Sequence, residues 1–211
     1  MDGFLNKDGK IIVGNLIKVI QENKAYLSDI DGLIGDGDHG VNMNKGFTMC
    51  QERLSDVEGM SEALKTLGRI LISEIGGSMG PLYGTFFNKM ARRSKAEEAI
   101  TKEVFGDMIK DAANGVSELG GAKVGDKTLM DVLIPATEAY HKALDEGKDF
   151  KGCLSDMKES AEKGWNSTKD LVAKIGRASR LGERSRGVLD AGATSCNLII
   201  QSMANTIESM L

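Results

Sequence analysis

Apolar residues recur at intervals of three and four along almost the whole chain, which is the spacing of the buried face of an amphipathic α-helix. Two of the 211 residues are proline and 5% are aromatic, so the sequence contains few helix breakers and few strand formers. No segment shows the alternation of a half-buried strand. The pattern predicts one all-α domain over residues 1–211. Its eight helices are expected at about residues 11–29, 39–54, 61–75, 81–90, 98–118, 128–146, 151–175 and 190–210.

Individual residues mark where several of these helices begin or bend. Ser61 and Asp190 are suited to helix N-caps, because their side-chain oxygens can accept hydrogen bonds from free backbone N–H groups. Pro81 fits the first turn of a helix, where no N–H is needed. Pro135 falls inside a helix and is expected to kink it.

Composition limits the partners of the chain. Lys and Arg total 27 against 31 Asp and Glu, a net charge of -4, which leaves no basic surface for a nucleic-acid backbone. The polar first ten residues do not resemble a signal peptide, and no apolar run is long enough to cross a membrane. The three cysteines lie far apart and are expected to be buried, reduced thiols. We expect a cytoplasmic protein that binds neither nucleic acid nor membrane.

The connections between the expected helices are of two alternating kinds. Those after the second, fourth and sixth helices are short and charged, whereas the others are rich in glycine. Alternate connections of an up-and-down antiparallel bundle emerge at the same end. The glycine-rich loops are therefore expected to form one rim, and loops held by a rigid scaffold often carry binding sites. These loops are residues 31–40, 76–80, 120–128 and 176–190.

Three carboxylates in the first of these loops predict a cation site. Asp31, Asp36 and Asp38 repel one another unless a cation lies between them, and oxygen ligands without Cys or His indicate Mg²⁺ or Ca²⁺. The loop lacks the glycine and glutamate positions of an EF-hand. A solvated acidic turn is the alternative interpretation of the same residues.

The helix that follows offers an anion site beside these carboxylates. Gly35, Gly37 and Gly40 have the spacing of the dinucleotide-binding fingerprint, but that motif requires a preceding strand, and a helix is expected here. Residues 39–42 instead begin a helix, whose free N–H groups favour an anion. His39 can hydrogen-bond a phosphate or cap this helix.

The other loops allow two interpretations each. The run from Gly76 to Gly80 lets the backbone approach a ligand or serves as a flexible turn. The loop before residue 128 is not a Walker loop, because Asp126 separates glycine from lysine, and it can cap a helix through Asp126 or Thr128. The arginines of the last loop either contact phosphates or partners or are solvated. They are Arg177, Arg180, Arg184 and Arg186.

Four motifs occur in order between about residue 11 and the C-terminus: IGDGDHGVNMNKGF, GGSMGPLYGTFF, GDKTLMDVLIPA and GRASRLGERSRGVLDAGATS. Together they closely resemble the ADP-binding subunits (subunit L) of phosphotransferase-system-dependent dihydroxyacetone kinases. The resemblance implies an eight-helix antiparallel barrel that holds ADP or ATP and two Mg²⁺ ions at one end.

The resemblance also implies individual site residues, although no catalytic residue is assigned. It makes Asp31, Asp36 and Asp38 the metal ligands. Met79 stands where many members carry Ser, so only a backbone contact is expected there. The implied nucleotide contacts are His39, Gly40, Val41, Asn42, Ser78, Met79, Gly120, Leu129, Arg177, Asp190, Ala191 and Gly192.

In this family the bound ADP is phosphorylated in place by a phosphohistidine of a multiphosphoryl subunit. The γ-phosphate then passes to dihydroxyacetone held by a K subunit. His39 favours this type over the related fatty-acid kinases, which tend to carry Thr after the same Gly-Asp-Gly-Asp run. The chain has no room for the K domain of single-chain enzymes, so it is expected to be inactive alone.

Two alternatives remain open from the sequence. The chain could serve another small ketose or polyol through a different partner, or it could be a nucleotide-dependent regulatory module. Self-association as a homodimer is open as well.

Overall fold

The computed structural model describes residues 2–211, and this part of the chain is mostly helical. Two short strands, β1 (Gly3–Leu5) and β2 (Ala99–Thr101), and short elements of 3-10 helix complete it. The α-helices are α1 (Lys10–Glu22), α2 (Lys24–Ile34), α3 (His39–Arg53), α4 (Gly59–Glu74), α5 (Met79–Ser94), α6 (Lys102–Gly120), α7 (Met130–Asp145), α8 (Phe150–Ser167) and α9 (Ala191–Met210).

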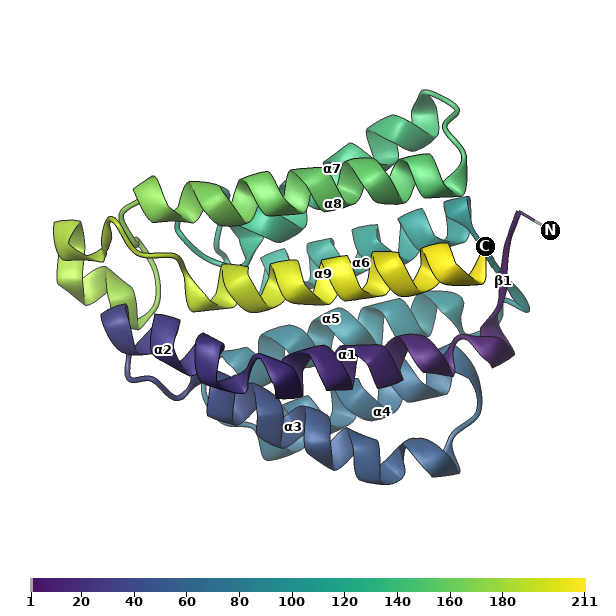
Figure 1. The fold of residues 1–211 in the computed structure, drawn as a ribbon, viewed down its shortest axis with the longest axis horizontal. Helices are drawn as coiled ribbons and strands as arrows, with labels where there is room; N and C mark the ends of the chain where they lie inside the picture. Colours follow the sequence, from purple (N-terminus) through teal and green to yellow (C-terminus); the bar gives the residue numbers. More distant parts are fainter. Residues whose placement is uncertain (1) are drawn as a thin grey trace.

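Eight of these helices form a closed ring, with α2 as an end-on extension of α1 (Figure 1). Around the ring, α1 packs on α3, each helix from α3 to α8 packs on the next, and α9 returns to α1. The expected all-α antiparallel barrel is confirmed. Apolar residues from all eight helices fill its interior, including the edge-to-face ring pairs Phe86–Phe87 and Phe105–Tyr140.

The prediction of one continuous helix over residues 11–29 is wrong, because the helix is interrupted at Asn23, between α1 and α2. The Asn23 side-chain amide donates a 2.8 Å hydrogen bond to the carbonyl oxygen of Val19. A side chain that competes for a backbone acceptor favours the end of a helix over its continuation. The break lets α2 lie against both α3 and α9, where the first glycine-rich loop begins.

The expectation of no strand is also wrong, since β1 pairs antiparallel with β2. Gly3 lies so close to the Ile100 carbonyl oxygen that a Cβ atom would overlap it. Next to β1, the Asn6 side-chain amide donates to Ser61 Oγ, 2.8 Å away, and to two backbone carbonyls. Ser61 therefore secures the N-terminal segment rather than capping α4, which begins at Gly59.

The expected helix at 151–175 ends earlier, at Ser167. Ser167 Oγ donates to the Gly164 carbonyl oxygen at 2.7 Å, and Thr168 Oγ1 donates to that of Trp165 at 2.7 Å. Two hydroxyls that take carbonyls of the last turn tighten it into the 3-10 turn η3 (Thr168–Asp170). The following segment to residue 190 contains a second 3-10 element, η4 (Arg177–Ser185).

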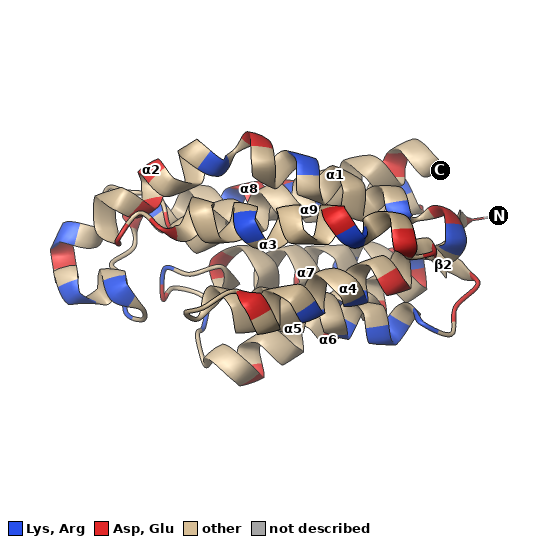
Figure 2. Ribbon diagram, turned by 90° about the horizontal axis from the view of Figure 1, so that it is seen from below, with Lys and Arg blue, Asp and Glu red and all other residues tan. Residues whose placement is uncertain are grey.

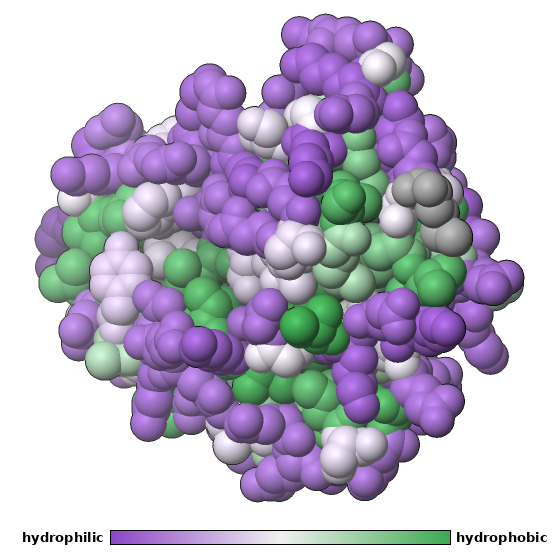
Figure 3. Space-filling model, turned by 45° about the vertical axis from the view of Figure 1, so that its right-hand side comes forward, coloured by the Kyte–Doolittle hydropathy of each residue, from purple (hydrophilic) through white to green (hydrophobic). Residues whose placement is uncertain are grey.

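The two ends of the barrel differ in character. The short charged loops and both strands lie at the end that carries the C-terminus, and the glycine-rich loops lie at the other end, with η4 outermost (Figures 1 and 2). Hydrophilic side chains dominate the face toward the strand end, and apolar side chains appear there in separate patches (Figure 3). Within residues 2–211 no helix combines the length and apolar character needed to span a membrane.

Candidate functional site

A cavity of about 840 Å³ opens at the glycine-rich end of the barrel. Residues from all four glycine-rich loops line it, so the prediction that these loops form one rim is confirmed. Its volume falls in the range of small-molecule and cofactor sites. The walls combine apolar side chains such as Leu82 and Val116 with carboxylates, an imidazole and a guanidinium.

Three carboxylates converge on one side of this cavity. Oxygen atoms of Asp31, Asp36 and Asp38 lie within 4.8 Å of one another. Asp31 comes from the last turn of α2, and the other two come from the turn before α3. An all-oxygen, triply charged donor set suits a hard divalent cation such as Mg²⁺. Arg177 forms an ion pair with Asp36, which offsets part of the repulsion.

His39 lies beside this cluster at the first position of α3. Its backbone N–H donates to Asp31 Oδ2 at 3.3 Å, which ties the start of α3 to the end of α2. Its Nε2 lies 2.9 Å from the hydroxyl of Ser195 on α9. Burial lowers the pKa of His39 to about 4, and the nearby Asp31 carboxylate opposes this shift. The imidazole is therefore neutral at physiological pH.

The N-terminus of α9 forms the opposite wall. Asp190 caps this helix as expected, with its Oδ2 accepting from the Ala193 N–H at 2.7 Å. Burial raises the pKa of Asp190 to about 7, although that hydrogen bond and the charge of Lys127 act against the shift. Ala191 and Gly192 follow in the first turn and also line the cavity.

Backbone from two further loops completes the lining. Ser78 and Met79 stand at the start of α5, where Ser78 is exposed and Met79 is half-buried against the core. Added Cβ atoms at Gly76 and Gly77 would meet nothing within 4 Å, so the loop presents open backbone rather than a packed turn. Gly120 and Leu129 lie across the cavity, at the end of α6 and before α7.

Lys127 is a member of this wall that sequence reasoning missed. Its side chain is 1% exposed, and its Nζ donates to the carbonyl oxygen of Thr168 at 2.5 Å and to that of Val188. Its φ of 64° lies in the left-handed region, which a lysine seldom adopts. Burial lowers the pKa of Lys127. The ammonium thus joins the loop before α7 to both ends of the segment that connects α8 to α9.

Asp131 was also missed from the sequence, and its carboxylate shares with Thr128 the capping role that was expected of Asp126 or Thr128. Its buried carboxylate accepts from the backbone N–H of Gly125 at 2.5 Å and of Thr128 at 2.7 Å. Asp126 instead accepts from Lys123 within its own loop, while Thr128 Oγ1 accepts from the Met130 N–H at 3.1 Å. Asp131 and Thr128 together fix the entry to α7, a pairing that the sequence signals only by a carboxylate three residues after Thr128.

The structure brings most of the expected site residues to the cavity. Gly40 and Val41 do not line it: Val41 is 49% exposed, and Gly40 packs against α2. A Cβ at residue 40 would overlap the Lys24 carbonyl oxygen and lie 2.8 Å from the Ser28 nitrogen. The expected residues that do line it are Asp31, Asp36, Asp38, His39, Asn42, Ser78, Met79, Gly120, Leu129, Arg177, Asp190, Ala191 and Gly192.

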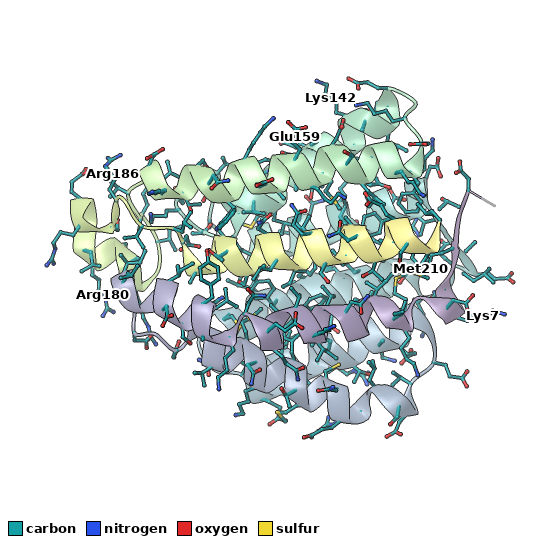
Figure 4. The ribbon with its side chains drawn as sticks, viewed as in Figure 1. Lys7, Lys142, Glu159, Arg180, Arg186 and Met210 are labelled. Atoms are coloured by element: carbon teal, nitrogen blue, oxygen red, sulfur yellow. The ribbon has the colours of Figure 1, made fainter. Side chains whose placement is uncertain are left out.

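The arginines beyond the cavity divide into two groups. Arg186 is held in place, because its guanidinium bonds Glu183 at 3.0 Å and the Asp170 carbonyl oxygen. Arg180 and Arg184 are exposed on η4, and Arg180 extends from the outer end of the barrel (Figure 4). Arg177 alone of the four reaches the carboxylate cluster.

Fold and site together define a helical barrel with an acidic ligand cavity at one end. The DAK2 domain model matches residues 33–205. The chain is 38% identical over 188 residues to the ADP-binding subunit DhaL of the PEP-dependent dihydroxyacetone kinase of Escherichia coli, covering 88% of this chain and 90% of that protein. It is 39% identical over 189 residues to the corresponding subunit of kinase 1 of Listeria innocua, covering 89% of each. The chain belongs to the DAK2 domain family.

Solved structures show the same fold. The native dihydroxyacetone kinase of C. freundii superposes with a TM-score of 0.70 at 22% identity, and the match covers 93% of this chain. The same enzyme in complex with AMP-PNP and Mg²⁺ gives a TM-score of 0.69 at 21% identity. The chain spans about a third of that protein's length, since each match covers 34% of it.

Proposed function

We propose that this chain is the ADP-binding subunit of a phosphoenolpyruvate-dependent dihydroxyacetone kinase, built as one domain over residues 1–211. The observation that carries the proposal is the convergence of Asp31, Asp36 and Asp38 with three helix N-termini on one cavity. Similarity over nearly the whole length of curated ADP-binding subunits supports it. So does the same fold in a kinase solved with AMP-PNP and Mg²⁺.

The cavity residues suit a magnesium nucleotide. The carboxylate cluster would hold the metal, for which we propose two ions, while the N-termini of α3, α5 and α9 direct free N–H groups and positive dipole ends toward the same space. Arg177 would turn from Asp36 to a phosphate oxygen. When bound, ADP or ATP supplies the phosphoryl group that is carried, and Mg²⁺ neutralises the charge on its oxygens.

The chain offers no sugar site in this proposal, so the reaction depends on partners. A phosphohistidine on a multiphosphoryl subunit would supply the phosphoryl group, and a K-type subunit would present dihydroxyacetone. The residues of this chain bind, orient and screen charge; none is required as a general acid or base, because phosphoryl transfer depends mainly on positioning and electrostatics.

The rim around the cavity is the surface that we propose both partners use. Exposed apolar side chains lie at the opening, with Leu119 54% and Ile175 40% exposed. Arg180 and Arg184 add positive charge beyond them. Apolar contacts of this kind stabilise a complex, while rim charges act mainly on the association rate and its salt dependence.

Measuring the nucleotide content of the purified protein tests the binding proposal. We expect about one ADP for each chain, with loss of nucleotide on EDTA treatment or in Asp36→Asn. Asp29→Asn is the matched control, because Asp29 is an exposed carboxylate in the same helix as Asp31 but outside the cluster. A purified protein that contains no nucleotide and whose full thermal stability is unaffected by EDTA would refute the proposal.

Reconstitution tests the partner requirement. The isolated chain should not phosphorylate dihydroxyacetone from ATP, whereas addition of a K-type subunit and a phosphohistidine donor should give turnover. Arg184→Ala should slow coupling to a partner and keep ADP bound, while Arg177→Ala should release ADP. Turnover by the chain alone at about 1–100 s⁻¹, the usual range of kinases, would contradict the requirement.

A further inference from the structure

A chain of buried hydrogen bonds runs from the core to the imidazole of His39. Tyr83 on α5 is 2% exposed, and its hydroxyl lies 2.6 Å from the hydroxyl of Ser195, which is fully buried on α9. Ser195 Oγ lies in turn 2.9 Å from Nε2 of His39. The carbonyl oxygen of Gly192 lies 3.0 Å from the Tyr83 hydroxyl and 3.1 Å from Ser195 Oγ.

Counting protons selects one arrangement of these bonds. Two hydroxyl protons serve the contact between Tyr83 and Ser195 and the bond to the Gly192 carbonyl, which can only accept. With both protons used in this way, the bond between Ser195 and His39 requires a proton on Nε2 of the imidazole. If Ser195 donated to His39 instead, the one remaining proton, on Tyr83, could serve either Ser195 or the Gly192 carbonyl, and two of the four short contacts would lack a proton. The Nε2–H form leaves one such contact.

We propose that Ser195 is a positioning residue that holds His39 as the Nε2–H tautomer, with Nδ1 left as an acceptor on the cavity wall. His39 lines the cavity, and among residues 2–211 no hydrogen bond is made to its Nδ1. The identity of the ligand rests on the proposed function, but the tautomer does not.

This arrangement changes the ligand group that His39 recognises. An unprotonated Nδ1 accepts a hydrogen bond and cannot donate one to a phosphate oxygen, the contact expected from the sequence. It requires a donor, such as a hydroxyl, an amine or a metal-bound water. A ligand group that carries only acceptor oxygens, placed at this point of the wall, would be repelled by the lone pair of His39 Nδ1.

Nitrogen-15 NMR of the nucleotide-free protein at pH 8 tests the tautomer directly. The sequence contains two histidines, so the spectrum is simple, and His39→Asn assigns the pair. His141 is an internal reference, because its Nε2 lies 3.0 Å from the carbonyl oxygen of Gly106 and must donate to it. We expect the His39 nitrogens to show the same pattern as His141, protonated at Nε2. A His39 protonated at Nδ1 would overturn the proposal.

Two variants and two matched controls test the role of the hydroxyls. Ser195→Ala should produce a population of His39 protonated at Nδ1, because Nε2 loses its acceptor. Tyr83→Phe should keep the Nε2–H form, because Ser195 Oγ can still accept from His39 and donate to the Gly192 carbonyl oxygen. Tyr140→Phe removes another buried phenol, which donates to the Lys102 carbonyl at 2.8 Å, away from the cavity. Ser202→Ala removes a hydroxyl two turns further along α9. Both controls should leave His39 unchanged.

Calorimetry with Mg²⁺–ADP separates positioning from a merely structural role. Ser195→Ala should weaken binding about five- to tenfold, as expected for one misoriented hydrogen bond, while Ser202→Ala stays within about twofold. If His39 keeps its wild-type spectrum in Ser195→Ala, the Ser195 hydroxyl does not set the tautomer and the proposal is refuted. If neither the wild-type protein nor any variant binds ADP but the tautomer shifts as expected, the proposed function fails and the positioning role stands.

Discussion

Replacing Asp38 by Asn should stabilise the empty protein and destabilise the loaded one. The Asp38 carboxylate lies within 4.8 Å of those of Asp31 and Asp36, so each pair repels by about 0.9 kcal/mol even at the dielectric constant of water. Asp38 makes no side-chain hydrogen bond as the N-cap of α3, so only its favourable interaction with the helix dipole is lost, about 0.5 kcal/mol. The balance is a gain of about 1 kcal/mol without metal.

Thermal unfolding in low salt, first with EDTA and then with Mg²⁺ and ADP, measures the change in stability of the empty protein and of the loaded protein. A gain of about 1 kcal/mol raises Tm by about 2–4 °C for a chain of this size, whereas Mg²⁺–ADP should stabilise Asp38→Asn far less than wild type. High salt should shrink the gain. Asp29→Asn, outside the cluster, should show neither effect. A lower Tm for Asp38→Asn in EDTA, or an equal rise in Tm for Asp38→Asn and Asp29→Asn, would show that repulsion between the three carboxylates does not destabilise the empty protein.

The remaining predictions concern stability without nucleotide. Because the pKa of His39 is lowered in the folded state, that state binds fewer protons than the unfolded state between about pH 4 and 6.5, and the free energy of unfolding decreases as the pH falls through this range. The raised pKa of Asp190 has the opposite effect, so the free energy of unfolding decreases as the pH rises from about 4 to 7. The free energy of unfolding in urea is therefore to be measured across this pH range. Compared with wild type, its slope against pH should be more negative in His39→Asn and more positive in Asp190→Asn. Slopes equal to that of wild type would contradict the assignments. Gly40→Ala should cost about 2–3 kcal/mol because α2 must move, while Gly14→Ala, whose Cβ would meet only a Leu54 methyl at 3.9 Å, should gain up to about 1 kcal/mol. Lys127→Met leaves two carbonyl oxygens unpaired and should cost about 2 kcal/mol or more in urea unfolding, an effect that a surface lysine would not show.

Helix spacing and loop parity made most of the architecture predictable. The four glycine-rich loops meet because two antiparallel helices separate each of them from the next, so the chain returns to the same end each time, a rule that needs no side-chain detail. The convergence of Asp31, Asp36 and Asp38 followed from their short separation, and Asp190 was recognisable as a cap from its place before small residues.

The unpredicted features depend on contacts between distant segments. The strand pair β1–β2 joins residues almost one hundred positions apart, with only three residues on each side, too few to show an alternating pattern. Lys127 has an ordinary surface residue type, and only the carbonyls of Thr168 and Val188 make its burial favourable. The end of α1 depends on one Asn23 side-chain bond, which composition does not reveal.

The strand pair has a practical consequence for joining other polypeptides to this barrel. It holds the start of the described chain at the end where α9 also finishes, opposite the cavity (Figure 1). The 20 residues of α9 span about 30 Å, so a segment attached after Leu211 needs roughly nine extended residues to return to the rim. Affinity tags and fluorescent fusions with shorter connectors can therefore be placed at either terminus with the opening left clear, and a fused sugar-binding domain would need a longer connector to reach it.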